Sequence, residues 1–489
     1  MITKSLFDLR KPRDECAVFG VFNNKDASAL TVLGLHALQH RGQDSTGIVS
    51  FSEKFLKFYG HRGIGQVSEV FGNSDIVKKL EGSSCIGHNR YGTTGETALK
   101  NVQPLFSEIL TGGIAIAHNG NLTNTNTLKN DLINSGSIFQ STSDTEVILH
   151  LISTTKGSLI DRLIYALHSI SGAYSLVMLS NDTLIGLRDP LGIRPLVLGK
   201  LNDSYILSSE SCGLDIIGAE LIRDVEPGEI VLINKQGLKS IKPFNNAKLR
   251  PCLFEYIYFS RPDSILEGKN VYEVRKNIGT ELAKESEKDD IKIDKVVPIP
   301  DSGNASALGF SEYIKKPFEF GIIRNHYTGR TFIEPSNSIR HLGVKLKHNP
   351  NLASIKNQSI ALIDDSIVRG TTSVKIVEML RSSGAKEIHM RIASPPVKHP
   401  CYYGIDTPSD DELLASKYTV EEIAKIIGVD TLKFISLDGV YRALGFKNGR
   451  NNKDPEFTDH YFSGDYPVKL VDKTIGNKPS QLSLLIETK

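Results

Sequence analysis

The stretch "IALIDDSIVRGTTS", residues 360–373, indicates the fold of the second half of the chain. An apolar strand leads to two adjacent carboxylates, and Ile376, Met379 and Leu380 then recur at the spacing of an amphipathic helix. Backbone N–H groups at a helix N-terminus bind anions, so the intervening loop is predicted to hold a phosphate. The carboxylates suit sugar hydroxyls or hydrated Mg²⁺, although an acidic turn that caps a helix is the alternative interpretation. The loop residues are Asp364, Asp365, Arg369, Gly370, Thr371, Thr372 and Ser373.

Strands and helices alternate around this loop. Apolar strands are predicted at 295–300, 359–365 and 387–394, with Gly384 at the C-terminal end of the intervening helix. This order indicates a parallel α/β unit, in which ligands collect at the carboxyl ends of the strands. Thr419 and Glu422 form a capping box for a helix through Ile427. The last ~35 residues carry few signals and are predicted to be irregular and to lie on the surface.

The first half, from residue 16 to about 245, is predicted to contain antiparallel sheets. Turn sequences flanked by apolar runs predict hairpins at Asn119-Gly120, 180–182, Asn202-Asp203 and 235–237. Helices are predicted near 27–40 and 144–155. The pattern changes near 245–255 without a Pro/Ser-rich linker, so the two halves are expected to pack together.

Composition narrows the class of protein. The 489 residues include 58 Lys+Arg and 56 Asp+Glu, a net charge of +2, which argues against a nucleic-acid binder. The five cysteines form no CxxC pair, which favours a reducing compartment. No apolar run reaches the ~18 residues of a membrane span, and the first fifteen residues do not resemble a secretory signal. A soluble, cytoplasmic protein without membrane or nucleic-acid partners is expected.

The 360–373 stretch resembles the phosphoribosyl pyrophosphate (PRPP) motif of type I phosphoribosyltransferases. The resemblance implies that Asp364 and Asp365 lie by the ribose and a Mg²⁺ ion, and that Arg369 and the 370–373 loop hold the 5-phosphate. "PIPDSGNASALG", 298–309, is similar to the family's pyrophosphate loop, and 324–335 to its flexible lid. Implied PRPP contacts in these segments and just beyond are Asp301, Ser302 (also a metal contact), Gly303, Tyr327, Arg330 and Lys345.

Cys16 precedes the apolar "AVFGVF", and the default interpretation of such a cysteine is a small core residue. "LQHRGQDSTG" (38–47), "GHNRYGTTG" (87–95), "AHNGNLTN" (117–124) and "STSDTE" (141–146) follow in order. Together these segments resemble the class II glutamine amidotransferase domain, an N-terminal nucleophile hydrolase. The resemblance implies that Cys16 becomes the first residue after removal of a propeptide, 1–15, and that its own α-amino group is the base.

Further roles follow from the same resemblance. Asn119 and the N–H of Gly120 would form an oxyanion hole. Arg90 would bind the carboxylate of glutamine, Asp144 its ammonium group, and Thr93 and Arg41 would support the glutamine site. Histidines 40, 88 and 118 beside these motifs are expected to be structural.

An amidotransferase half (16–245) before a phosphoribosyltransferase half (246–470) and a tail (471–489) resembles the amidophosphoribosyltransferases. The resemblance implies conversion of glutamine, PRPP and water to 5-phosphoribosylamine, glutamate and diphosphate, the committed step of purine synthesis. It also implies Mg²⁺, homo-oligomers such as dimers or tetramers, feedback inhibition by purine nucleotides, and an internal ammonia path with Tyr258 as a candidate wall. The nucleotide preference, the oligomer size and the role of the tail stay open.

The chain departs from the family at one point. Some members hold a [4Fe–4S] cluster with four cysteines, and Cys252 and Cys401 stand in two of the expected contexts. The expected C-terminal pair is absent, because "FTDHYFSGDYP", 457–467, contains no cysteine. A cluster of this kind needs four thiolates, so no cluster is predicted.

Two alternatives remain open from the sequence. A hexosamine-phosphate synthase is also a class II amidotransferase, but it needs a sugar-isomerase half that 360–373 does not fit. A non-enzymatic PRPP sensor would not need Cys16, Arg90, Asn119 and Asp144 together.

Overall fold

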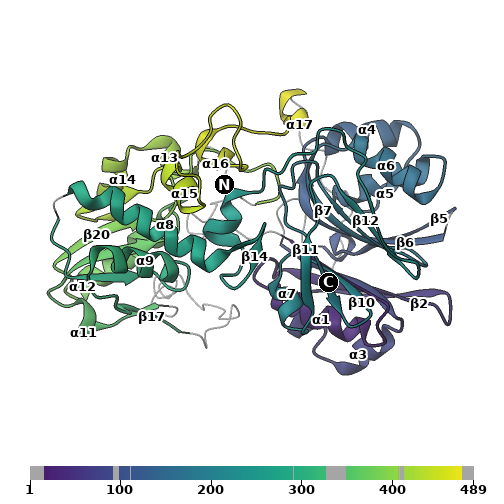
Figure 1. The fold of residues 1–489 in the computed structure, drawn as a ribbon, viewed down its shortest axis with the longest axis horizontal. Helices are drawn as coiled ribbons and strands as arrows, with labels where there is room; N and C mark the ends of the chain where they lie inside the picture. The colour runs from purple at the N-terminus through teal and green to yellow at the C-terminus, as the bar shows by residue number, and fades with distance from the viewer. Residues whose placement is uncertain are drawn as a thin grey trace, which may run out of the picture.

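Two antiparallel sheets and one parallel sheet organise the chain into two lobes (Figure 1). The computed structural model of the protein describes residues 16–91, 98–110, 112–289, 291–325, 348–405, 407 and 412–475. The antiparallel sheets come from residues before 242, and the four-stranded parallel sheet comes from residues after 294.

The first antiparallel sheet has β1 near its centre, and Cys16 directly precedes this strand. Its order is β11 (Glu220–Asp224), β9 (Val197–Leu201), β10 (Ser204–Ser208), β1 (Ala17–Phe22), β4 (Ser84–Arg90), β2 (Ser45–Ser52) and β3 (Lys57–Ile64). The helices of this layer are α1 (Ala27–Ala37), α2 (Val67–Val70), α3 (Ser74–Lys79) and α7 (Cys212–Asp215).

The second sheet packs face to face on the first. Its order is β13 (Gly237–Ile241), β12 (Ile230–Asn234), β8 (Leu184–Arg188), β7 (Gly172–Leu179), β6 (Gly112–Leu122) and β5 (Leu105–Ile109). Val18 and Ile86 of the first sheet share a buried cluster with Ala117 and Val177 of the second. Its outer face carries α4 (Thr125–Asn134), α5 (Thr145–Thr154) and α6 (Leu159–Ser169), so this lobe has helical layers outside two sheets (Figure 1).

Three of the four predicted hairpins are confirmed, at 180–182, Asn202-Asp203 and 235–237. The predicted turn at Asn119-Gly120 is wrong, because β6 continues through both residues to Leu122. Gly120 pairs with Tyr174 at a φ of +146°, and a Cβ there would lie 2.0 Å from the carbonyl oxygen of Ala173. The glycine therefore serves close strand packing and not a turn.

The second lobe is the predicted parallel α/β unit. Its sheet order is β16 (Lys295–Pro298), β19 (Ser359–Asp364), β20 (Glu387–Ile392) and β21 (Thr431–Phe434). One face packs on α8 (Val271–Ser286), α9 (Asn304–Ile314) and α15 (Leu437–Ala443), and the other on α12 (Thr371–Ser382) and α14 (Val420–Ile427). The predicted capping box of Thr419 and Glu422 is confirmed.

Short elements complete the described chain. The strand pairs are β14 (Ile265–Leu266) with β15 (Lys269–Asn270), and β17 (Ile322–Arg324) with β18 (His348–Pro350). Glu255–Phe259 forms a π-helical turn, η2, where the chain enters the second lobe. The remaining helical segments are η1 (Leu99–Asn101), η3 (Glu287–Asp289), α11 (Leu352–Ile355), α13 (Leu414–Lys417), α16 (His460–Ser463) and α17 (Val471–Ile475).

The two halves pack together as expected, and the C-terminal region takes part. Tyr461 shares a buried cluster with Ala173 and Ile193 of the first half and with Phe254 and Tyr403 of the second. The prediction that this region lies on the surface is therefore wrong for 457–461, which are buried, with Phe457 in the core of the second lobe and Tyr461 at the junction. The figure shows α16 at the junction (Figure 1).

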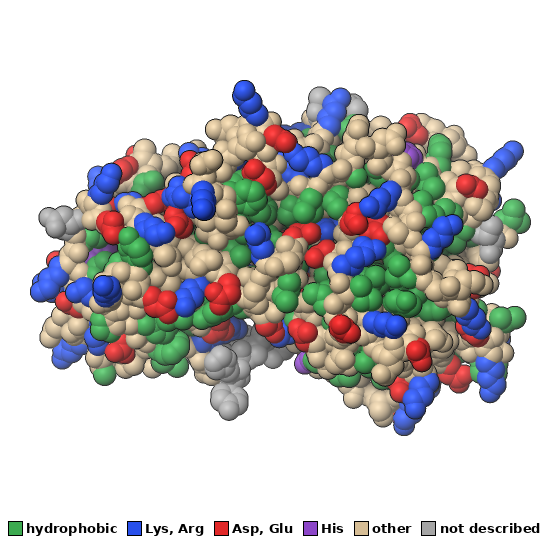
Figure 2. All heavy atoms as spheres, viewed as in Figure 1, with side chains coloured by type: hydrophobic (Ala, Val, Ile, Leu, Met, Phe, Trp, Pro, Cys, Tyr) green, Lys and Arg blue, Asp and Glu red, His purple; other side chains and the backbone are tan. Residues whose placement is uncertain are grey.

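The surface shows no dominance of one charge. Figure 2 shows Lys and Arg side chains interspersed with Asp and Glu over both lobes on one face, in agreement with the net charge of +2. Within the described residues, no helix combines the length and the apolar character that a membrane crossing requires.

Candidate active sites

Cys16 lies directly before β1 and is half-buried. Burial raises the pKa of its thiol, while a hydrogen bond from the Tyr91 N–H and the positive charge of Arg90 oppose the increase. A thiol with a raised pKa stays protonated at neutral pH, so its use as a nucleophile requires a base close by.

Arg90 and Asp144 have opposite effects on this thiol. The positive charge of Arg90 lowers the pKa of Cys16, and the negative charge of Asp144 raises it. Arg90 ends β4 and donates from Nη1 to the Asn101 carbonyl at 2.9 Å. Burial favours a higher pKa for Asp144, but His118, at 3.5 Å, and the Leu122 N–H, at 3.1 Å, hold that pKa below its usual value. A cation and an anion beside one thiol can bind both ends of an amino acid.

Asn119 lies on β6 three residues before Leu122, whose N–H donates to Asp144. Its side chain is fully buried, and neither amide atom has a hydrogen-bond partner among the described residues. A buried amide without hydrogen-bond partners lowers the stability of the folded protein by about 1–3 kcal/mol. Such groups are typical of sites where a ligand supplies the missing hydrogen bonds. The role of Asn119 and Gly120 in an oxyanion hole stays a prediction.

Arg41 is buried, and its guanidinium is held by protein groups. It donates from Nε to the Cys16 carbonyl at 3.2 Å, and it pairs with Glu210 at 2.5 Å and Glu255 at 2.8 Å. These contacts direct Arg41 to the backbone of Cys16.

The three histidines have protein partners in the described structure. His40 donates to Glu210 at 2.8 Å, and His88 donates to the His118 carbonyl at 3.0 Å. Burial lowers the pKa of His88 to about 3, so this ring stays neutral. These contacts agree with structural roles.

The second candidate site lies at the carboxyl edge of the parallel sheet. Asp364 ends β19, Asp365 follows it, and both side chains are buried. The Asp365 N–H donates to Asp364 Oδ1 at 2.9 Å, and the Ser366 N–H donates to Asp365 Oδ1 at 2.7 Å. Burial lowers the pKa of Arg275, on α8, to about 10. The negative charge of Asp365 opposes this decrease, so the two side chains lie close enough to interact.

The loop after these carboxylates leads into α12 as predicted. Gly370 has a φ of +73° and immediately precedes the helix, whose first residues are Thr371, Thr372 and Ser373. The N-terminal N–H groups of a twelve-residue helix thus face the carboxyl edge of the sheet, which suits a phosphate. Arg369 pairs with Glu412 at 3.0 Å in this structure.

The predicted pyrophosphate loop lies beside this edge. The Ile299 N–H donates to the Ile363 carbonyl at 2.8 Å, which brings residues 301–303 next to the end of β19. Asp301 is ion-paired with Arg324, and Gly303 immediately precedes α9. The structure therefore brings the predicted 301–303 and 364–373 segments together. Four predicted residues lie outside the described residues: Thr93, Tyr327, Arg330 and Lys345.

The residues present fit Mg²⁺ better than a cluster. The described residues contain no group of three or more His, Cys, Asp or Glu side chains that could hold a metal. Mg²⁺ is commonly held by one or two carboxylates together with substrate phosphates, which agrees with the buried Asp364 and Asp365. At the lobe junction, the Tyr461 hydroxyl lies 3.3 Å from the sulfur of Cys252 and 3.4 Å from that of Cys401, so two thiols and a phenol do not provide the four thiolates of a [4Fe–4S] cluster.

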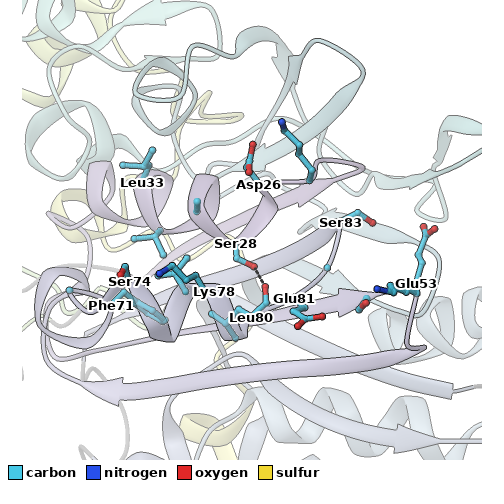
Figure 3. A pocket seen from close by; sticks show the side chains of 18 residues that line it. Asp26, Ser28, Leu33, Glu53, Phe71, Ser74, Lys78, Leu80, Glu81 and Ser83 are labelled. Carbon is cyan, nitrogen blue, oxygen red and sulfur yellow. Dashed lines mark hydrogen bonds between the residues drawn. The ribbon is translucent and has the colours of Figure 1, made fainter.

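A hollow of about 1070 Å³ lies elsewhere, at the other end of β1 from Cys16 (Figure 3). Its walls come from α1, α3 and the loops between strands of the first sheet, and include Asp26, Leu33, Phe71, Lys78 and Glu81. None of the predicted site residues lines this hollow, so the volume of a cavity does not identify the active site in this protein.

Comparisons with known proteins identify the family of the chain. Residues 88–215 match the glutamine amidotransferase domain family. The amidophosphoribosyltransferase of Rhizobium etli is 55% identical over 96% of each chain, and that of Bacillus subtilis is 43% identical over 96% of this chain and 98% of its own. The chain belongs to the amidophosphoribosyltransferase family. A solved structure, the glutamine PRPP amidotransferase from B. subtilis complexed with ADP and GMP, covers 93% of this chain and 98% of its own with a TM-score of 0.87.

Membership of the amidophosphoribosyltransferase family confirms the predicted fold class, an N-terminal nucleophile hydrolase followed by a type I phosphoribosyltransferase. It also decides between the alternatives, because this family consists of glutamine-dependent transferases and not of hexosamine-phosphate synthases or PRPP sensors.

Sequence reasoning missed several residues that the structure brings to these sites. Tyr91, Glu210, Glu255 and Arg275 contact the predicted residues or the backbone around them. Glu210 and Glu255 lie 169 and 214 positions from Arg41, so no local pattern in the sequence indicated these contacts.

Proposed function

We propose that Cys16 releases ammonia from glutamine and that the ammonia attacks C1 of PRPP held at the 364–373 loop. The first supporting observation is a half-buried thiol whose pKa is changed by the charges of both Arg90 and Asp144. The second is the buried amide of Asn119, which has no hydrogen-bond partner among the described residues and lies on β6, the strand whose Leu122 N–H donates to Asp144. On this proposal Cys16 is the nucleophile, Arg90 and Asp144 are the two binding charges, and Asn119 is the oxyanion donor.

In the first half-reaction, the α-amino group of processed Cys16 takes the thiol proton, since its reference pKa of about 7.7–8.0 leaves a useful fraction unprotonated at neutral pH. The sulfur then attacks the side-chain amide carbon of glutamine. Asn119 and the Gly120 N–H stabilise the oxyanion, the amide nitrogen takes the proton, and ammonia leaves. Water then hydrolyses the thioester, which releases glutamate and restores the thiol. Arg90 and Asp144 orient the substrate, with Thr93 as support.

In the second half-reaction, PRPP lies across the carboxyl edge of the parallel sheet. The 370–373 loop and the N-terminus of α12 bind the 5-phosphate, with Arg369 nearby, and Asp364 and Asp365 bind the ribose hydroxyls. The 301–303 loop holds the diphosphate, and Tyr327, Arg330 and Lys345 are proposed to cover it. Mg²⁺, held by Asp364, Asp365 and Ser302, would supply charge neutralisation for the leaving diphosphate. Ammonia bonds to C1 as the C1–O bond to diphosphate breaks.

The wider assignment follows the family. We place the division of the chain at 1–15, 16–245, 246–470 and 471–489, with the first segment a propeptide. A cytoplasmic homo-oligomer, inhibited by purine nucleotides, is proposed for this chain, in keeping with the ADP and GMP named for the B. subtilis structure. A [4Fe–4S] cluster is not part of the proposal.

Two variants test the assignment. Cys16→Ser should abolish the use of glutamine but retain synthesis of phosphoribosylamine from free ammonia, because the second site is untouched. Asp365→Ala should impair synthesis from either nitrogen source. Cys85→Ala, at a buried thiol within the core of the first lobe, is the matched control and should retain both activities. Glutamine-dependent activity in Cys16→Ser equal to that of the wild type would place the nucleophile elsewhere.

A further inference from the structure

A buried carboxylate from the second lobe contributes to the anchoring of the nucleophile. Glu255 receives Arg41 Nη2 on Oε1 at 2.8 Å and Arg41 Nη1 on Oε2 at 3.0 Å. Arg41 in turn donates from Nε to the carbonyl of Cys16 at 3.2 Å. Both ionic side chains are almost fully buried, at 2% exposure each. One guanidinium therefore links the backbone of Cys16 to a residue more than 200 positions later in the chain.

The turn that carries Glu255 is held firmly by the second lobe. Ser260 donates from Oγ to Glu255 Oε2 at 2.6 Å, and Arg194 approaches Oε1 at 3.4 Å. Arg275 of α8 donates to the carbonyls of Tyr256 at 2.8 Å and Ser260 at 2.7 Å, which fixes both ends of the turn. The position of Glu255 is thus set by the packing of η2 against α8.

The charges in this group stabilise one another. Burial alone would raise the pKa of Glu255, but Arg41 and Arg194 hold that pKa below its usual value. Glu255 and Glu210 together raise the pKa of Arg41 against the effect of burial. The pair therefore stays ionised over the whole neutral range, and the anchoring does not change with pH.

Cys16 has a special need for such an anchor. Under the proposed function it is the first residue of the processed chain, so no preceding peptide holds it. Its α-amino group is attached to Cα and its sulfur to the adjacent Cβ, so a rotation of the residue would move the nucleophile and the base together. Its carbonyl oxygen is the backbone group that Arg41 binds.

We propose that Glu255 is a positioning residue for Cys16, which it holds in the attacking geometry through Arg41. The inference rests on the proposed function, since it presumes that Cys16 is the nucleophile. It adds that a residue of the phosphoribosyltransferase half sets the rate of glutamine hydrolysis without touching glutamine.

The test compares Glu255→Gln with a matched variant, Glu267→Gln. Glu267 also forms an ion pair across the lobes, but it is only partly buried and its partner is Arg188, at 2.7 Å, and not Arg41. For each purified variant, the kcat and KM for glutamine are measured, together with synthesis from free ammonia. The ammonia reaction reports on the folding of the second lobe in the same preparation.

For Glu255→Gln we expect the glutamine-dependent kcat to fall by about 10²-fold, the cost of a nucleophile misplaced by about 1 Å. The KM for glutamine and the ammonia-dependent rate should stay within about threefold of wild type, because the residues that bind glutamine are unchanged. The midpoints of the pH–rate profile should not shift, because the α-amino group that acts as base is also unchanged. Arg41→Lys, which keeps the charge and loses the Nε donor, should lower kcat similarly, and the double variant should be no worse than either single variant.

The inference is overturned if Glu255→Gln retains its kcat, if its KM rises while kcat does not fall, or if the ammonia-dependent rate falls in parallel. An equal loss in Glu267→Gln would also overturn it, because the effect would then report looser lobe packing. Failure of the proposed function itself is seen separately, as glutamine use by Cys16→Ser.

Discussion

Replacement of Asn119 by alanine should separate catalysis from stability. The side chain is fully buried on β6, and both of its amide atoms lack hydrogen-bond partners among the described residues. An amide in this state costs the folded protein about 1–3 kcal/mol, and its removal returns that amount against a small cavity penalty. The same group is the proposed donor to the oxyanion.

The two effects have opposite signs. Loss of one oxyanion donor costs about 2.7–4 kcal/mol of barrier, so the glutamine-dependent kcat of Asn119→Ala should fall by about 10²–10³-fold. The thermal transition should be no lower than that of the wild-type protein. Synthesis from free ammonia should be unchanged, because it bypasses the first site.

Asn89 provides the matched control on the neighbouring sheet. It is equally buried, but its Nδ2 donates to the Leu35 carbonyl at 2.7 Å and its Oδ1 accepts from Thr46 at 2.9 Å. Asn89→Ala should therefore lose about 1–3 kcal/mol of stability, since it leaves buried groups without partners. The assays are calorimetry and initial rates with glutamine and with ammonia. A large loss of stability in Asn119→Ala, or a kcat for glutamine within tenfold of wild type, would refute the reasoning.

Other predictions concern maturation, iron and acid. Intact mass spectrometry of active enzyme should show cleavage between Glu15 and Cys16, and full activity in a chain that retains residues 1–15 would contradict the assigned base. Anaerobically purified protein should contain no stoichiometric iron or acid-labile sulfide; about four irons per chain would refute the role of Cys252 and Cys401 as thiols. Because burial lowers the pKa of His88 to about 3, the unfolded chain binds more protons below about pH 6.5. Stability should therefore fall from pH 6.5 toward 3, with a smaller slope in His88→Gln, as measured by denaturant titration.

Local signals in the sequence predicted much of the second lobe. The helix after the acidic pair runs from Thr371 to Ser382, and Thr419 caps α14 as its spacing with Glu422 indicated. Three of the four predicted hairpins are also confirmed, because their turn residues lie next to the strands that they join. Such features depend on residues a few positions apart, which a single sequence displays directly.

The errors have long-range causes. Asn119-Gly120 has the composition of a hairpin turn, but β7 packs so closely that only glycine fits beside the Ala173 carbonyl in an unbroken strand. The 457–461 segment is buried because Tyr461 fits between two thiols contributed by distant segments. In the candidate sites, the motifs indicated Cys16 and Asp364, whereas the partners of Arg41 lie 169 and 214 positions away and carry no local signature.

The ion pairs between the lobes limit how far this protein can be treated as two interchangeable modules. A truncated chain that ends near residue 245 would retain Arg41 and Arg188 but lose Glu255 and Glu267, so Arg41 would keep Glu210 as a partner and the buried Arg188 would lose its ion pair with Glu267. Breaking a buried pair in this way typically costs about 3–5 kcal/mol. A chimera that joins this amidotransferase half to another transferase therefore needs acidic residues at the positions of Glu255 and Glu267. Candidate transferase halves should be selected first for acidic residues at these two positions.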